Sequence, residues 1–234
     1  MISIQIKKPE MDYFCEEAYK SLRTNLLLCG SDKKVIALTS CTSGEGKSSV
    51  SLSLGISLAE AGKRVLLIEA DMRKPVLAGR LGVTGVNCGL SHVLAGQAQM
   101  KDAVCVADIP DFYVMFAGAI PPNPTELLGN DILGRMIKVL KRVYDYIIID
   151  TPPLGRVIDC AVAARYCDGI ILVVEADAIS YRFAKEVKQQ LEKTNCPVLG
   201  AVLNKCKREN YAYYGKYKRY GEYKRYRKED EGEA

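Results

Sequence analysis

Apolar residues along this chain occur in two arrangements, short unbroken runs and longer stretches in which they recur every three or four positions. The unbroken runs are typical of strands buried on both faces, and they lie at 35–38, 64–71, 112–116, 144–150, 169–176 and 197–205. The helical spacing predicts helices over 12–28, 50–61 and 180–194, whereas glycines interrupt every pattern between 76 and 111. Strands and helices that alternate in this order predict an α/β fold, with a mostly parallel sheet and helices on both faces.

A glycine-containing loop separates the first of these strands from the next helix. The segment from Ser40 to Ser49 reads Ser-Cys-Thr-Ser-Gly-Glu-Gly-Lys-Ser-Ser, and a strand, such a loop and a helix in this order are the setting of a P-loop NTPase. The glycines let backbone N–H groups point into one concavity, where the positive end of the helix dipole also attracts phosphate. We therefore expect ATP to bind at Ser43, Gly44, Glu45, Gly46, Lys47, Ser48 and Ser49. Lys47 is expected to reach the β- and γ-phosphates and Ser48 to bind Mg²⁺, although Cys41 stands where the strict motif has its first glycine.

Polar side chains follow three of the predicted strands. Glu69 and Asp71 end the run 64–71, and Asp150 follows three isoleucines in a Walker B pattern. Because ligands of open α/β sheets lie at the carboxyl ends of the strands, we expect Asp71 and Asp150 to hold Mg²⁺ beside Ser48. We expect Asp71 first, and Glu69 second, to accept a proton. Asn204 ends the last strand and is suited to the edge of an adenine, although asparagine also suits a turn.

Two helices carry further signals near their starts. Asn123, Pro124 and Glu126 predict an N-cap, a first helical residue and a capping-box partner. In the helix 12–28, charged residues recur every three positions along one face, and by themselves they indicate a solvent-exposed surface with local ion pairs. These residues are Glu17, Lys20 and Arg23.

The composition is that of an ordinary globular protein. The 234 residues are 48% hydrophobic and 26% charged, which suits one α/β domain. No apolar run approaches the roughly 18–20 residues of a membrane span, and the first residues lack the apolar region of a signal peptide, so we expect a cytoplasmic protein. Nine scattered cysteines without a Cys-x-x-Cys pair, and a single histidine (His92), favour mostly buried thiols and a structural histidine over a metal site.

The net charge of +5 is concentrated near the C-terminus. Residues 205–228 hold ten Lys or Arg against two Glu, whereas 229–234 hold four acidic residues. Because 207–228 contain no Leu, Ile, Val or Phe, we expect one domain over 1–205 and a flexible tail over 206–234. The tail carries the tyrosines Tyr211, Tyr213, Tyr214, Tyr217, Tyr220, Tyr223 and Tyr226. Three interpretations stay open on this composition: a nucleic-acid-binding segment, a solubilising end, and a substrate for tyrosine modification.

The motifs together resemble those of the bacterial tyrosine kinases, the cytoplasmic catalytic proteins of capsule and exopolysaccharide systems. The loop 43–48 is similar to the family's Pro-Gly-Glu-Gly-Lys-Ser loop, with serine in place of proline. The segment 67–73 resembles the family's Asp-x-Asp-x-Arg motif, with Glu69 in place of the first Asp, and 147–153 matches its Walker B form.

The predicted helix near the N-terminus resembles a ring-forming motif of the same family. Glu17-x-x-Lys20-x-x-Arg23 is similar to Glu-x-x-Arg-x-x-Arg, with lysine in place of the first arginine. Lysine lacks the planar fork with which arginine forms two parallel hydrogen bonds, so the resemblance implies a ring of lower stability than usual.

The resemblance also implies an activity and a set of partners. It implies phosphorylation of tyrosine with ATP and Mg²⁺, mainly between neighbouring subunits of a ring-like homo-oligomer and on the C-terminal tyrosines. It implies a separate membrane-spanning activator that recruits the chain to the inner face of the membrane, a cognate tyrosine phosphatase, and a role in polysaccharide synthesis and export. No nucleic-acid partner is expected.

The rival interpretation on the same fold is a partitioning or site-selection ATPase, which acts as a dimeric switch. Proteins of that class usually have a second lysine early in the loop, at the position of Thr42. They also have no use for a tyrosine-rich tail. Both features favour the kinase.

Overall fold

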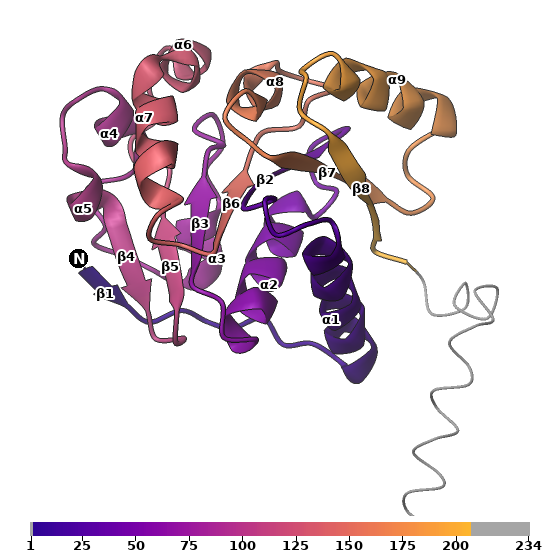
Figure 1. Ribbon diagram of the computed structural model, residues 1–234, viewed down its shortest axis with the longest axis horizontal. Coiled ribbons are helices and arrows are strands. Elements are labelled where there is room, and N and C mark those ends of the chain that lie inside the picture. Colours follow the sequence, from indigo (N-terminus) through magenta and orange to yellow (C-terminus); the bar gives the residue numbers. More distant parts are fainter. Residues whose placement is uncertain (1, 207–234) are drawn as a thin grey trace, which may run out of the picture.

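A single eight-stranded sheet forms the centre of the computed structural model, which describes residues 2–206 (Figure 1). The strand order is β1-β4-β5-β3-β6-β2-β7-β8, and all neighbours run parallel except β4 and β5. The strands are β1 (Ile2–Ile4), β2 (Val35–Ser40), β3 (Val65–Glu69), β4 (Val104–Ala107), β5 (Phe112–Met115), β6 (Tyr146–Asp150), β7 (Gly169–Glu175) and β8 (Val198–Asn204). The mostly parallel sheet predicted from the sequence is confirmed. The seven tail tyrosines lie outside the described residues, so the expected tail stays a prediction.

Helices cover both faces of this sheet. They are α1 (Tyr13–Leu28), α2 (Lys47–Glu60), α3 (Leu77–Leu81), α4 (Leu90–Leu94), α5 (Met100–Ala103), α6 (Pro124–Gly129), α7 (Asp131–Leu140), α8 (Asp159–Ala164) and α9 (Tyr181–Glu192). Among the described residues, no helix combines the length and the apolar character that crossing a membrane requires.

The central strands alternate their side chains between two apolar layers, because successive residues of a strand point to opposite faces. In β2, Ile36 and Leu38 belong to the apolar cluster that includes residues of α1, α2 and α3. Val35 belongs to the cluster that includes residues of α4 to α7, and Ala37 to the one that includes residues of α8 and α9. All four are fully buried, which explains why the strand is an unbroken apolar run in the sequence.

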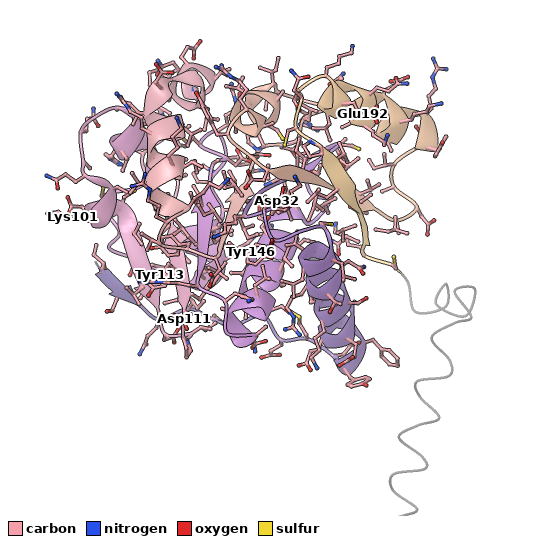
Figure 2. The ribbon with its side chains drawn as sticks, viewed as in Figure 1. Asp32, Lys101, Asp111, Tyr113, Tyr146 and Glu192 are labelled. Atoms are coloured by element: carbon pink, nitrogen blue, oxygen red, sulfur yellow. The ribbon has the colours of Figure 1, made fainter. Side chains whose placement is uncertain are left out.

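The edge formed by β1, β4 and β5 was not predicted as a unit. Only β5 was expected, whereas β4 lies in the glycine-interrupted region and β1 is three residues long. β4 and β5 form an antiparallel pair joined through Asp111, labelled in Figure 2, which adopts a φ of +58°. Aspartate tolerates this left-handed conformation better than most residues, so the Pro110-Asp111 pair suits the turn of this connection.

One predicted helix start is wrong in its detail. Asn123 stands at the N-cap position of α6 and Pro124 is the first helical residue, as expected, but the Asn123 side chain accepts no capping hydrogen bond. The capping box with Glu126 is therefore absent from this helix start. The neighbouring Asn130 caps α7 instead, because its Oδ1 accepts hydrogen bonds from the backbone N–H groups of Ile132 and Leu133.

The cysteines differ widely in burial, and this predicts selective alkylation. Cys15 and Cys29 are exposed, whereas burial raises the pKa of Cys41 and of Cys196 to about 11. At pH 8 a thiol of that pKa is ionised to about one part in a thousand, and only the thiolate reacts. Brief treatment with iodoacetamide followed by peptide mass spectrometry should therefore modify Cys15 and Cys29 and spare Cys41 and Cys196. Equal modification of all four in the folded protein would contradict this burial.

Candidate nucleotide-binding site

The phosphate-binding loop joins β2 to α2 at the carboxyl edge of the sheet. Gly44 and Gly46 adopt φ values of +94° and +87°, a region that side chains strongly disfavour. At Gly46 a Cβ atom would also lie 2.1 Å from Nδ2 of Asn204. That amide donates a hydrogen bond of 2.8 Å to the carbonyl oxygen of Glu45. Asn204, expected at the adenine edge, thus holds the loop backbone from the end of β8.

These contacts predict different costs for alanine at the two glycines. Gly44→Ala adds only left-handed strain of about 1–2 kcal/mol, because no atom lies within 4 Å of its Cβ position. Gly46→Ala adds the overlap with Asn204, so we expect at least about tenfold weaker ATP binding than in Gly44→Ala, measured by calorimetry. The double variant Gly46→Ala/Asn204→Ala should recover part of the loss, and no recovery would mean that backbone strain alone sets the cost.

The side chain of Glu45 braces the loop from within. It is 1% exposed, and its Oε1 accepts hydrogen bonds from the backbone N–H and the hydroxyl of Thr42. Its Oε2 accepts from the backbone N–H of Glu175 at 3.2 Å. Glu45 therefore fixes the loop to β7, and its expected contact with a nucleotide would come through its backbone.

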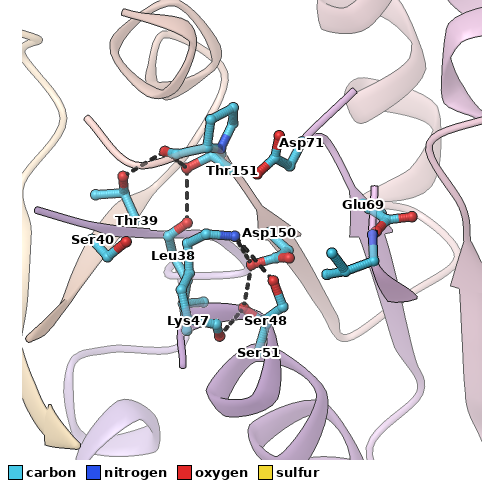
Figure 3. A network of polar contacts seen from close by, with 12 residues as sticks. Leu38, Thr39, Ser40, Lys47, Ser48, Ser51, Glu69, Asp71, Asp150 and Thr151 are labelled. Carbon is cyan, nitrogen blue, oxygen red and sulfur yellow. Dashed lines mark hydrogen bonds and ion pairs between the residues drawn. The ribbon is translucent and has the colours of Figure 1, made fainter. Parts of the chain in front are cut away.

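Lys47 and Asp150 form a buried ion pair beneath the loop (Figure 3). Lys47 Nζ donates to Asp150 Oδ1 at 2.6 Å and lies 3.2 Å from the Ser48 hydroxyl, and Ser51 Oγ donates to the same carboxylate oxygen at 3.0 Å. The other oxygen, Asp150 Oδ2, is buried and has no partner among the described residues. An unpaired buried carboxylate oxygen is costly, and a metal-bound water would satisfy it. The structure thus brings together the lysine, the serine and the Walker B aspartate that the sequence predicted.

Asp71 lies beside this pair in the loop after β3. It lines the cavity above the phosphate-binding loop, and its Oδ1 accepts a hydrogen bond of 3.1 Å from the backbone N–H of Lys74. Burial raises the pKa of Asp71, and the positive charge of Lys47 partly offsets that rise. A raised pKa makes a carboxylate a better proton acceptor.

Glu69 lies in a different environment from the one expected for the proton acceptor that its sequence position suggested. It is 1% exposed, lies apart from Lys47 in Figure 3 and does not line the cavity. Its Oε1 accepts from the backbone N–H groups of Val76 and Leu77 at 2.6 and 2.7 Å, and its Oε2 accepts from that of Ala117 at 3.2 Å. Burial raises the pKa of Glu69, against the effect of these three donors. Of the two expected proton acceptors, the geometry favours Asp71, and Glu69 holds the loop that carries it.

The cavity above the loop measures about 310 Å³, and it is lined in part by cations that were not predicted from the sequence as ligand-binding. The predicted residues that line it are Ser43, Gly44, Glu45, Gly46, Lys47, Ser48 and Asp71, and the added cations are Arg73, Lys74, Arg80 and Arg156. Ser49 lies outside the lining, and its hydroxyl accepts a hydrogen bond of 2.5 Å from Arg80 Nη1. Arg73 forms a two-point ion pair with Asp159, at 2.8 and 3.0 Å. Arg73, the arginine of the Asp-x-Asp-x-Arg motif, was the one sequence signal for these four cations.

The three residues of the expected ring-forming motif lie on α1, away from this cavity. Lys20 Nζ and Glu17 Oε1 form an exposed ion pair of 2.8 Å. Arg23 is partly buried and donates 2.7 Å to the carbonyl oxygen of Ser57 in α2. The first pair is the local surface contact that the helical spacing indicated, and Arg23 attaches α1 to the helix that follows the phosphate-binding loop.

Known proteins resemble this chain over most of its length. Residues 33–195 match the model of an AAA domain family. The tyrosine-protein kinase CpsD of Streptococcus agalactiae is 44% identical over 202 residues, which cover 86% of this chain and 88% of that protein.

Solved structures show the same relationship. The kinase domain of the Escherichia coli tyrosine kinase ETK superposes with a TM-score of 0.76 at 29% identity, over 82% of this chain and 77% of that one. The septum site-determining protein MinD from Pyrococcus horikoshii, in complex with Mg-ADP, gives a TM-score of 0.63 at 30% identity, over 73% and 69% of the two chains. Because a relative named as a tyrosine-protein kinase is 44% identical over 86% of the chain, this protein belongs to the family of bacterial tyrosine-protein kinases.

Proposed function

We propose that this chain transfers the γ-phosphate of ATP to tyrosines of its own C-terminal cluster, between neighbouring copies. The acceptors are Tyr211, Tyr213, Tyr214, Tyr217, Tyr220, Tyr223 and Tyr226. The observation that carries the proposal is the buried Lys47–Asp150 pair beneath a glycine loop, with Asp71 at the same cavity, in a chain of the tyrosine-kinase family.

The residues of the site fit ATP and Mg²⁺. Loop amides of 43–49 and the Lys47 ammonium would hold the phosphates, and the oxygens of Ser48, Asp71 and Asp150 would hold the metal or its waters. The unpartnered Asp150 Oδ2 is the atom that most needs such a ligand. When bound, Mg²⁺ neutralises charge on the transferred phosphoryl group.

Asp71 supplies the remaining chemistry. The tyrosine hydroxyl has a pKa of about 10 and is a poor nucleophile at neutral pH. Asp71 takes its proton while the phenolic oxygen bonds to the γ-phosphorus and the bond to the β–γ bridging oxygen breaks. The products are phosphotyrosine, ADP and a proton that Asp71 returns to water.

The family supports a wider setting for this reaction. We propose that the chain forms a ring-like homo-oligomer through Glu17, Lys20 and Arg23. A transmembrane activator recruits this oligomer to the membrane, and a tyrosine phosphatase removes the phosphates. In this setting the kinase controls capsule or exopolysaccharide synthesis. Each phosphate adds about −1.5 to −2 charges. Seven of them would invert the charge of a segment that holds ten Lys or Arg against two Glu, and the ring would loosen. An oligomer whose size is independent of tail phosphorylation would contradict this last step.

Phosphosite mass spectrometry tests the transfer itself. The parent chain and Lys47→Met are incubated with Mg·ATP and a peptide from the cytoplasmic end of the candidate activator. We expect phosphotyrosine between Tyr211 and Tyr226 in the parent and no detectable phosphotyrosine in the variant over the same reaction time. ATP hydrolysis with an unmodified tail would favour a MinD-like switch ATPase instead, the alternative that the lower TM-score already disfavours.

A further inference from the structure

Three exposed cations stand at the mouth of the cavity, beyond the phosphate-binding loop. Lys74 lies in the loop after β3, Arg80 belongs to α3 and Arg156 lies between β6 and α8, and all three line the cavity. We call Lys74, Arg80 and Arg156 the basic rim.

The positive charge of the basic rim is poorly balanced by its surroundings. Within residues 2–206, Arg80 donates a hydrogen bond only to a neutral hydroxyl, that of Ser49, and no ion pair or hydrogen bond engages the side chain of Lys74 or Arg156. The carboxylates that line the same cavity are Glu45, which is buried against Thr42, and Asp71. By contrast, Arg73 is already paired with Asp159.

A basic rim is a poor entrance for the tyrosines that the site is proposed to modify. Residues 205–228 hold ten Lys or Arg against two Glu, so they are repelled by a cationic rim. Directly after them stand Glu229, Asp230, Glu231 and Glu233. This acidic end has the charge that the basic rim attracts.

The end of β8 lies close enough for this contact to form. Asn204 Nδ2 donates to Glu45 O in the phosphate-binding loop, so residue 205 leaves the domain beside the cavity. An unstructured chain of the length from 205 to 229 has an average span of about 25–30 Å. Tethering at that range gives an effective concentration on the order of millimolar.

We propose that the basic rim is a docking site for an acidic peptide segment, and that the acidic end 229–234 of this chain is its occupant. When the acidic end of a neighbouring copy docks there, it offsets the repulsion of the basic segment and brings the tyrosines nearest to it, Tyr223 and Tyr226, to the site first. The chain's own acidic end competes for the same rim. The order of phosphorylation rests on the proposed function, whereas the docking does not.

Binding is tested with the full chain in which the acidic end is neutralised by Glu229→Gln, Asp230→Asn, Glu231→Gln and Glu233→Gln. A fluorescent peptide of residues 226–234 is titrated by anisotropy in the presence of saturating Mg·ADP. We expect it to bind this neutral-end variant more tightly than the parent, in which the chain's own acidic end competes, and to bind less at higher salt. Adding Lys74→Glu or Arg156→Glu should weaken binding about tenfold.

The matched control is Lys101→Glu, an exposed lysine of α5 at the other end of the sheet (Figure 2). It should leave peptide binding unchanged. Equal weakening of peptide binding by Lys101→Glu and Lys74→Glu would overturn the docking site, because the contact would then be non-specific. Loss of the bound peptide on addition of Mg·ADP would also overturn it, because the cations would then serve the nucleotide.

A time course of phosphosites tests the consequence. In the parent, phosphate should appear on Tyr223 and Tyr226 before the other tail tyrosines, and the neutral-end variant should lose this order. The same order in both proteins would refute the anchoring role. No phosphotyrosine in either protein would refute the proposed function and leave the binding result to stand on its own.

Discussion

Replacing Lys47 by methionine is expected to lower the rate of phosphotyrosine formation by about 10²–10³-fold, the usual cost of losing one preorganised charge contact to the transition state. The same substitution should also lower the free energy of unfolding, by about 3–5 kcal/mol. Asp150 is fully buried and Lys47 Nζ is its ion-pair partner at 2.6 Å. Without the ammonium group a buried carboxylate keeps one hydrogen bond from Ser51 and loses its neutralising charge.

The double variant Lys47→Met/Asp150→Asn separates the two effects. Because it removes both buried charges, it should recover much of the lost stability in urea denaturation while remaining inactive. Each protein is compared by its unfolding midpoint and by phosphotyrosine formed per chain. A double variant as unstable as Lys47→Met would show that the ion pair is not the source of the cost, and a double variant that regains activity would remove Lys47 from the mechanism.

The parts of the fold that the sequence predicted are those in which local pattern and tertiary burial agree. β2, β3 and β6 lie between two helical layers and are apolar up to their carboxyl ends, so they stand out as unbroken runs. β4 lies near the sheet edge among glycine-interrupted segments, and its four residues leave too short a pattern for periodicity to register, whereas β5 was expected from the apolar run 112–116. The turn at Asp111 between the two strands is a local sequence feature from which their pairing could have been predicted.

The candidate site also divides into residues that local sequence patterns predicted and residues that only the tertiary fold brings together. Positions from Ser43 to Ser48 were predictable because the loop sequence itself dictates its backbone, and the aspartates because strands deliver them to one edge. The basic rim joins three segments that only the tertiary fold brings together, so no linear motif marks it. The bracing roles of Glu45 and Glu69 were also hidden, since their partners are backbone N–H groups whose positions no side-chain pattern records.

Replacing Glu69 by alanine is expected to lower the free energy of unfolding by about 3–5 kcal/mol and the rate of phosphotransfer at least about tenfold. The substitution leaves the backbone N–H groups of Val76, Leu77 and Ala117, two of them buried, without their acceptor. Two of these belong to the segment that follows Asp71, so the proton acceptor loses its fixed position. Urea denaturation and phosphosite mass spectrometry measure the two effects.

Glu69→Gln is the matched control, because its one remaining oxygen still serves Val76 and Leu77 while its amide group opposes the N–H of Ala117. Its stability should lie between those of the parent and Glu69→Ala.

The pH dependence of stability gives an independent check. Since burial raises the pKa of Glu69 above its usual value of 4.5, the folded state binds this proton at a higher pH than the unfolded state does. The free energy of unfolding of the parent therefore rises as pH falls from the raised pKa towards 4.5. Both variants should lack this rise. The same pH profile in all three proteins would assign the rise to other carboxyl groups.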